Sequence, residues 1–111
     1  MADIEERIAL GTLLDFYGPL LTEHRSEIVR QYCEEDMSLS EIADTMGITR
    51  QGVSDALNKA RRQLEDYETR LGLAARYRLI RREAEEGIRH LDAGEIPAAR
   101  ERLMNILRIE R

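Results

Sequence analysis

Apolar residues recur at spacings of three and four along most of this 111-residue chain, with polar and charged residues between them. That spacing places the apolar side chains on one face of an α-helix. No segment alternates apolar and polar residues long enough to predict a strand. The pattern therefore predicts an all-α fold with six helices, over residues 4–17, 23–35, 39–46, 50–71, 73–93 and about 97–110.

Glycine, proline and capping residues mark the first helix ends. Gly18-Pro19 is expected to end the first helix, because glycine tolerates a left-handed C-cap and proline cannot extend a helix. Thr22 is a suitable N-cap for the second helix. The acidic run at 34–36 follows that helix, where negative charge is unfavourable for the helix dipole, so we expect fraying there.

Residues 38–62 carry the pattern of a helix-turn-helix. Ser38 and Glu41 form a Ser-x-x-Glu capping box at the start of a short helix. Gly47 supplies a tight turn, and Thr49 can cap a second, longer helix. Two helices joined in this way place the second one, the recognition helix, in the major groove of DNA. The expected core is a winged-helix-type DNA-binding core without the wing.

The outward face of that recognition helix carries the candidate binding residues. Its apolar positions between Val53 and Leu64 should be buried, which leaves polar and basic side chains outside. The candidates are Arg50, Gln51, Ser54, Asn58, Lys59, Arg61 and Arg62. Arginine can pair with guanine and amides with adenine, so the first three are expected to read bases, and the later cations to bind phosphates. Asp55 lies close to the same face and would repel phosphate.

Gly72 interrupts the helical pattern and separates two predicted parts, a helix-turn-helix domain over 1–71 and a C-terminal helical hairpin over 72–111. Gly94 fits a helix C-cap, and Pro97 fits the first turn of the last helix. Both arms of the hairpin carry apolar stripes. Since small helix-turn-helix proteins often dimerise to read two half-sites, we expect a homodimer built on the hairpin. Packing onto the first helix is the alternative.

The charge distribution is uneven. Residues 48–82 hold nine basic and four acidic groups, whereas residues 1–47 hold three basic and eleven acidic groups, within a net charge of −5. A basic block can attract phosphates, although an exposed helix with ordinary solvating charges would look similar. The acidic helices of the first block could instead bind a basic protein surface.

No set of residues predicts catalysis, a metal site or a cofactor. Cys33 lies on an apolar stripe and is expected to be a buried small hydrophobe, and a single cysteine permits no internal disulfide. His24 and His90 are isolated and lack the spacing of metal ligands. No apolar stretch is long enough to span a membrane, and the acidic N-terminus lacks a signal region. We therefore expect a cytoplasmic protein that is not an enzyme.

Three segments resemble the YlxM family of small bacterial helix-turn-helix proteins. They are Asp-Phe-Tyr-Gly-Pro-Leu-Leu-Thr at 15–22, Ser-Leu-Ser-Glu-Ile-Ala at 38–43 and Ile-Thr-Arg-Gln-Gly-Val at 48–53. The resemblance covers roughly residues 10–75; Gly52 departs from it, because the family usually has alanine there. That family is similar to the DNA-reading fourth region of sigma factors, and its genes tend to lie beside those of the signal recognition particle.

The resemblance implies a sigma-like module with accessory or regulatory work in the protein-targeting pathway of that particle. It also implies the particle's RNA and its GTPase as partners. We interpret the chain as a non-enzymatic nucleic-acid-binding or regulatory protein. One alternative is a transcription regulator that binds specific DNA sequences, and another is a protein-interaction module without nucleic-acid binding.

Overall fold

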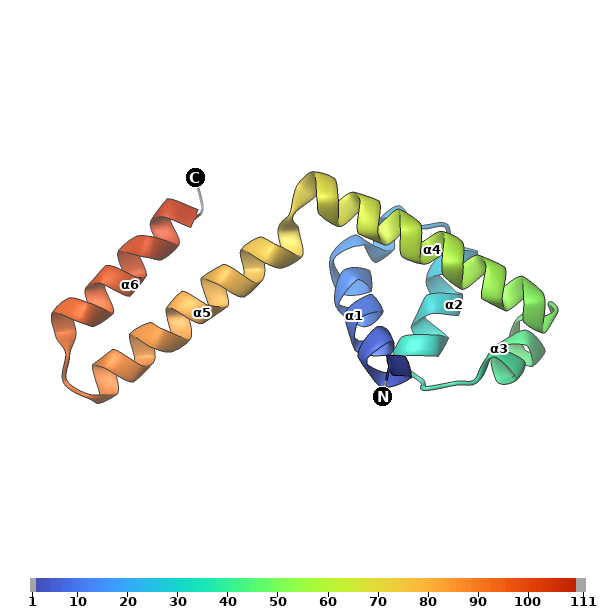
Figure 1. Cartoon of the computed structure of the whole chain (residues 1–111), viewed down its shortest axis with the longest axis horizontal. Helices are drawn as coiled ribbons and strands as arrows, with labels where there is room; N and C mark the ends of the chain where they lie inside the picture. Colours follow the sequence, from blue (N-terminus) through green and yellow to red (C-terminus); the bar gives the residue numbers. More distant parts are fainter. Residues whose placement is uncertain (1, 110–111) are drawn as a thin grey trace. The chain divides into compact units, whose positions relative to one another are not determined.

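The computed structural model describes residues 2–109 and forms only helices and their connections there, which confirms the all-α prediction. The chain divides after Leu71 into two compact units. No helix in the described range is long and apolar enough to cross a membrane. The elements drawn in Figure 1 are α1 (Ala2–Tyr17), η1 (Gly18–Leu20), α2 (Glu23–Cys33), α3 (Leu39–Met46), α4 (Arg50–Leu71), α5 (Leu73–Asp92) and α6 (Ile96–Ile109).

The first unit is built on α4, against which α1, α2 and α3 all pack (Figure 1). Apolar residues from the four helices meet in one core, in which Tyr17, Ile28 and Ile42 are fully buried. On α4 the predicted stripe packs into this core from Val53 to Leu64, and only Ala56 within it is partly exposed. Because the core takes up this stripe, the opposite, polar face of α4 is directed to solvent.

The connection from α1 to α2 corrects one prediction. Gly18 does not adopt the left-handed conformation expected of it, and it begins the short 3-10 turn η1 instead. A Cβ at this position would lie only 3.2 Å from Leu14 Cδ1, so the buried backbone approaches α1 closely there. Thr22 caps α2 as predicted, since its hydroxyl accepts a hydrogen bond of 3.2 Å from the backbone N–H of Arg25.

Helix α2 ends at Cys33, two residues before the predicted end, and the chain then turns through Asp36, which has a φ of 56°. An arginine from α1 stabilises this turn. Arg7 Nη1 donates to the carbonyl oxygens of Tyr32, at 2.5 Å, and Met37, at 3.1 Å, and it lies 3.4 Å from Asp36 Oδ1. The cation thus offsets the negative end of the helix dipole and the acidic run that follows it.

The helix-turn-helix begins and turns as its capping residues predict. Ser38 N–H donates to Glu41 Oε1 at 2.9 Å, and Glu41 N–H donates to Ser38 Oγ at 3.1 Å, which completes the capping box. Gly47 adopts the left-handed conformation with a φ of 68°. Thr49 Oγ1 then accepts a hydrogen bond of 2.9 Å from the N–H of Gly52 and so caps α4.

The second unit is a hairpin in which α5 and α6 lie side by side and run in opposite directions (Figure 1). Gly72 and Gly94 precede its two helices with φ values of 63° and 76°. The two helices meet at small residues, since Gly87 and Ala99 are buried and a Cβ on Gly87 would lie 3.6 Å from Arg102 Cβ. The prediction that α6 reaches Glu110 concerns a position outside the described residues.

The hairpin leaves much of its predicted apolar stripe exposed. Leu107 is 62% exposed, and Ile88 is 59% exposed. A small apolar hollow between the two helices is lined by residues of both arms, including Ala84, Leu91 and Leu103. Two helices are too few to enclose a core of their own. The exposed large apolar residues on α5 and α6 are Leu73, Tyr77, Leu79, Ile88, Leu91, Ile96, Leu103 and Leu107.

Candidate nucleic-acid interface

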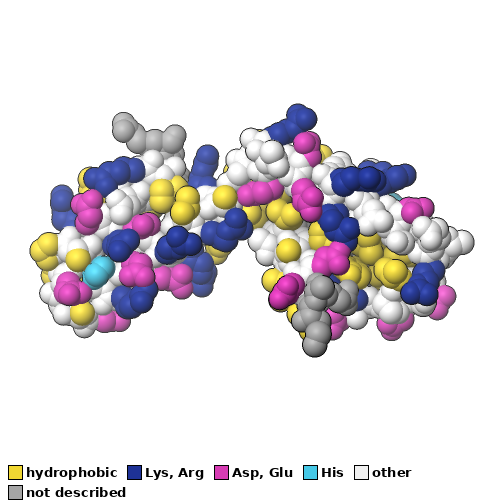
Figure 2. All heavy atoms as spheres, in the orientation of Figure 1, with side chains coloured by type: hydrophobic (Ala, Val, Ile, Leu, Met, Phe, Trp, Pro, Cys, Tyr) yellow, Lys and Arg dark blue, Asp and Glu magenta, His cyan; other side chains and the backbone are white. Residues whose placement is uncertain are grey.

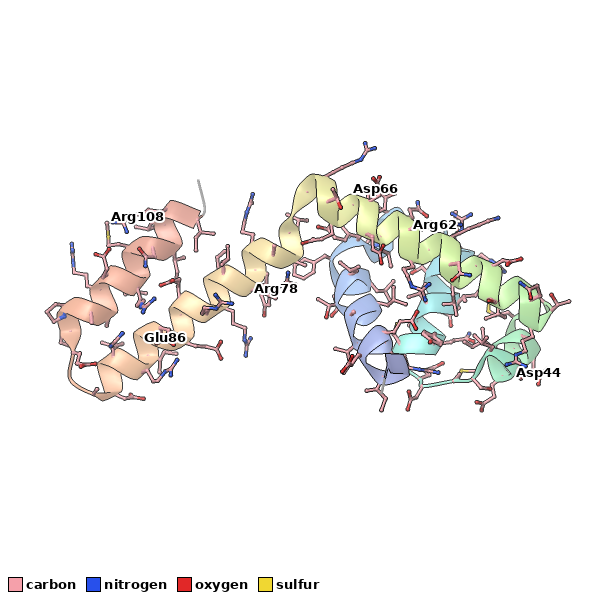
Figure 3. All side chains as sticks on the ribbon, in the orientation of Figure 1. Asp44, Arg62, Asp66, Arg78, Glu86 and Arg108 are labelled. Carbon is pink, nitrogen blue, oxygen red and sulfur yellow. The ribbon has the colours of Figure 1, made fainter. Side chains whose placement is uncertain are left out.

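All seven predicted binding residues lie on α4, outside its buried stripe; Figure 3 labels Arg62 on this helix. Five of them have exposed side chains, while Ser54 and Arg61 are partly buried. The hydrogen bond from Gly52 N–H to Thr49 fixes the first turn of α4 and thereby the direction in which each later side chain points. The local sequence therefore sets which residues face outward.

The N-terminal turns of α3 and α4 lie beside one another. Leu39 of α3 and Arg50, Gln51 and Ser54 of α4 line one hollow at the surface. The structure thus brings together the three residues that the sequence assigned to base reading. A guanidinium, an amide and a hydroxyl together offer both donors and acceptors of hydrogen bonds, as contacts with base edges require.

A carboxylate lies within the same face of α4. Asp55 Oδ1 accepts a hydrogen bond of 3.0 Å from Gln51 Nε2. Asp55 also lines a second surface hollow, together with Asn58, Lys59, Arg61 and Arg62. Its negative charge lowers the electrostatic potential among these cations, and the attraction between this face and a phosphate is weakened accordingly.

The structure differs from the prediction at Arg61, which is predicted to be exposed. Its side chain is 30% exposed, and Nη2 forms an ion pair with the carboxylate of Glu6 on α1. Nη1 donates a hydrogen bond of 2.8 Å to Asn58 Oδ1. The sequence offered no local signal for this pair, because Glu6 lies on a different helix. Arg61 must therefore leave an internal partner before it can bind a phosphate with that nitrogen.

Three cations on α4 form no ion pair within the described residues and are available to an external partner. Within residues 2–109, the side chains of Arg50, Lys59 and Arg62 take part in no ion pair or hydrogen bond and are exposed. Figure 2 shows dark-blue side chains gathered over α4. A cation without an internal partner can contact a phosphate with no ion pair to break first.

The groups that could support other chemistry are placed differently. Burial raises the pKa of the Cys33 thiol to about 11, which keeps it protonated and unreactive at neutral pH. His24 is exposed, and His90 Nδ1 lies 2.8 Å from Glu95 Oε1. Over the described range, no three histidine, cysteine or acidic residues come together as a group that could hold a metal ion.

Comparison with known proteins agrees with this architecture. A family described as "Putative helix-turn-helix protein, YlxM / p13 like", UPF0122, matches residues 4–94, which extends beyond the stretch of 10–75 over which the motifs resemble that family. A UPF0122 protein of Symbiobacterium thermophilum is 44% identical over 110 residues, which cover 99% of each chain.

Two further relatives show the same relationship. A UPF0122 protein of Desulforamulus reducens is 38% identical over 102 residues, covering 89% of this chain and 87% of the relative. One from Caldanaerobacter subterraneus is 43% identical over 84 residues, covering 75% of this chain and 72% of the relative. With its helix-turn-helix and its match over most of its length, the chain belongs to the UPF0122 family of YlxM- and p13-like helix-turn-helix proteins.

Proposed function

We propose that this protein binds nucleic acid through the outward face of α4 and acts in the cytoplasm as an accessory or regulatory protein of the signal recognition particle pathway. The observation that carries the binding proposal is the set of three exposed cations without internal partners, Arg50, Lys59 and Arg62. The pathway follows from the resemblance to the YlxM family. The particle's RNA is the proposed nucleic acid, and its GTPase is a candidate protein partner.

The chemistry of α4 divides the proposed contacts into two groups. Lys59 and Arg62, in the middle of α4, suit phosphates, which supply most of the affinity but no sequence information. Arg50, Gln51 and Ser54, at the start of the helix, are the groups that can reach bases. Arg61 and Asn58 hold one another through a hydrogen bond and would contribute after Arg61 leaves Glu6.

A specific observation favours a second candidate, a transcription regulator that binds duplex DNA. The shared hollow of Leu39 with Arg50, Gln51 and Ser54 lies at the N-terminal turn of α4, which is the part of a recognition helix that enters the major groove. Since a single recognition helix reads few base pairs, this function would require two copies.

The exposed stripe of the hairpin supports such a pair, and we infer that it forms a homodimer. Leucine and isoleucine side chains on both arms surround an apolar hollow that a second hairpin could fill, giving a four-helix arrangement. A second copy of the chain is always available as a partner. Pairing with it would cover an apolar surface of the kind that proteins rarely leave exposed. Light scattering at micromolar concentration tests this inference: twice the chain mass of 12.8 kDa is expected, and a single chain mass would contradict it.

The binding proposal is tested by fluorescence anisotropy with labelled signal recognition particle RNA and, in parallel, random duplex DNA, at about 150 mM salt, where screening is near physiological. Lys59→Glu with Arg62→Glu should weaken binding by about tenfold or more, because two phosphate contacts become repulsive. Arg78→Glu with Arg100→Glu is the matched control, since both side chains are exposed on the hairpin; Figure 3 labels Arg78 on α5.

The three outcomes separate the candidates. Preference for the RNA, lost in the α4 variant but kept in the control, supports the targeting-pathway function. Preference for the duplex, lost in the same variant, supports the transcription regulator. Binding that the α4 variant retains contradicts the proposed interface. No binding to either probe also contradicts it and favours a protein-interaction module.

A further inference from the structure

The first unit has a second concave surface, a groove between α1 and α2 with a volume of about 380 Å³. Leu14, near the end of α1, lines it together with Pro19 and Leu21 from the connection to α2. The neighbouring Leu20 is 52% exposed and adds apolar surface beside it. No residue of α4 lines this groove, so it is distinct from the candidate nucleic-acid interface.

The side chains on the α2 side of the groove form a straight row along the helix. Glu23, Ser26, Arg30 and Glu34 line it, at spacings of three and four that place them on one face of the helix. At a rise of about 1.5 Å per residue, the row extends for roughly 16 Å, which is three turns of a helix. The groove is therefore long enough to accept a helical segment of similar length.

The lining of the groove carries a net negative charge. Asp15 on α1 and Glu23 and Glu34 at the two ends of α2 are exposed. The one cation in the lining, Arg30, is held by acids on its own helix and just beyond it: it donates to Glu27 at 3.0 and 2.5 Å and lies 3.3 Å from Glu35. Its contact with Glu34 is longer, at 3.9 Å.

We propose that this groove is a docking site for a basic amphipathic helix of another protein. Leucine or methionine side chains of the partner would lie against the exposed Pro19 and Leu20, over a floor formed by Leu14 and Leu21, which are 8% and 7% exposed. Lysine or arginine side chains would lie beside Asp15 and the acidic ends of α2. Amphipathic helices bind grooves in this way, and complementary charge selects the partner and its orientation. The same acidic groups repel phosphates, so nucleic acid is a poor occupant.

This site goes beyond the proposed nucleic-acid function and is independent of it. Lys59 and Arg62 on α4 present positive charge, whereas Asp15 and Glu34 at the groove present negative charge. Because the two surfaces share no residue, a nucleic acid on one and a basic helix on the other can be bound at the same time. The protein would then act as an adaptor between the two.

The test uses a labelled helical peptide of about 18 residues, with leucine along one face and lysine on its flanks. A second peptide has glutamate in place of every lysine. Anisotropy titrations with the full chain should show saturable binding of the lysine peptide only. Asp15→Lys with Glu34→Lys should weaken this binding by about tenfold or more. Both positions lie at helix C-termini, where a cation is favourable for the dipole, so the fold should be retained.

Controls separate a specific groove from general attraction to an acidic protein. Asp44→Lys with Glu65→Lys makes the same change in net charge at exposed positions outside the groove and should alter binding by no more than about twofold; Figure 3 labels Asp44 on α3. The isosteric pair Asp15→Asn with Glu34→Gln should weaken binding about threefold or more, which keeps the test valid if the lysine pair unfolds.

Two results would overturn the proposal: equal weakening by the groove and control variants, or equal binding of the lysine and glutamate peptides by the original chain. The variant Lys59→Glu with Arg62→Glu should bind the lysine peptide at least as tightly as the original chain. Failure of the nucleic-acid proposal is thereby distinguishable from failure of this one.

Discussion

The guanidinium of Arg7 lies over the ring of Tyr32, with 3.9 Å between Cζ and the ring centroid. The same side chain donates hydrogen bonds to the backbone carbonyl of Tyr32, in the last turn of α2, and to that of Met37, in the connection to α3. One residue near the start of the chain thus combines a cation–π contact with a cap for a different helix. This contact connects α1 to the segment that leads into the helix-turn-helix.

Arg7→Ala should lower the free energy of unfolding by about 2–3 kcal/mol, because it removes charged hydrogen bonds and a cation–π contact from a side chain that is 14% exposed. Urea unfolding followed by circular dichroism measures the change. Arg78→Ala, at an exposed position of the hairpin, is the control and should change stability by less than about 0.5 kcal/mol. A loss that small at Arg7 would mean that the contact contributes little.

Asp55→Asn should increase the affinity of α4 for nucleic acid by about threefold, because a negative charge is removed from among the cations. The asparagine oxygen can still accept the hydrogen bond from Gln51, so the first turns of α4 are preserved. Anisotropy titrations should show the gain shrinking as salt rises. Asp66→Asn, farther along α4, is the matched substitution, and an equal gain there would indicate a general charge effect.

Protonation of Glu27 should make the protein less stable in acid. The hydrogen bond from Arg30, with a second one from Gln31, lowers the pKa of Glu27 from 4.5 to about 2. Since the folded-state pKa is the lower one, the stabilisation is complete above about pH 4.5 and is lost as the pH falls towards 2. Glu27→Gln should therefore flatten the fall of the melting temperature across this window.

Thermal unfolding at a series of pH values measures the effect, and Glu65→Gln, at an exposed position of α4, is the control. If the melting temperature of the Glu27→Gln variant falls as steeply as that of the original protein, the carboxylate does not contribute as described. The glutamine keeps the shape of the side chain, so a general loss of packing is avoided.

Cys33 should react slowly with thiol reagents. Burial raises the pKa of its thiol from 9.0 to about 11, so the thiolate fraction at pH 8 is about 100-fold lower than for an ordinary cysteine. Reaction with a disulfide reagent, followed by absorbance, should be slow for the folded protein and should accelerate in urea. Rapid reaction without denaturant would show that the thiol is accessible and ionised.

Local signals in the sequence predicted the elements well because their causes are local. The capping box of Ser38 and Glu41, the left-handed Gly47 and the capping hydroxyl of Thr49 each act within a few residues of themselves. Gly18 was the exception, because its role depends on the close approach of Leu14 and not on backbone freedom.

Features that depend on distant residues could not be predicted in this way. Arg61 was assigned to the outward face of α4, but Glu6 from α1 holds it. Gln31 gave no sequence signal, yet it is buried and its Oε1 accepts a hydrogen bond of 2.7 Å from Thr45 on α3. Helical periodicity describes one helix at a time, so it reports nothing about which polar groups meet between helices.

The short turn from Gly47 to Thr49 sets the rotational phase of α4. Each residue advances a helix by about 100°, so a single insertion after the Thr49 cap, within the first turn of α4, would turn Val53 out of the core and bring a polar residue into its place. Arg62 would move away from the outward face with the same rotation. Natural variation in length should therefore be rare between Gly47 and the first turn of α4.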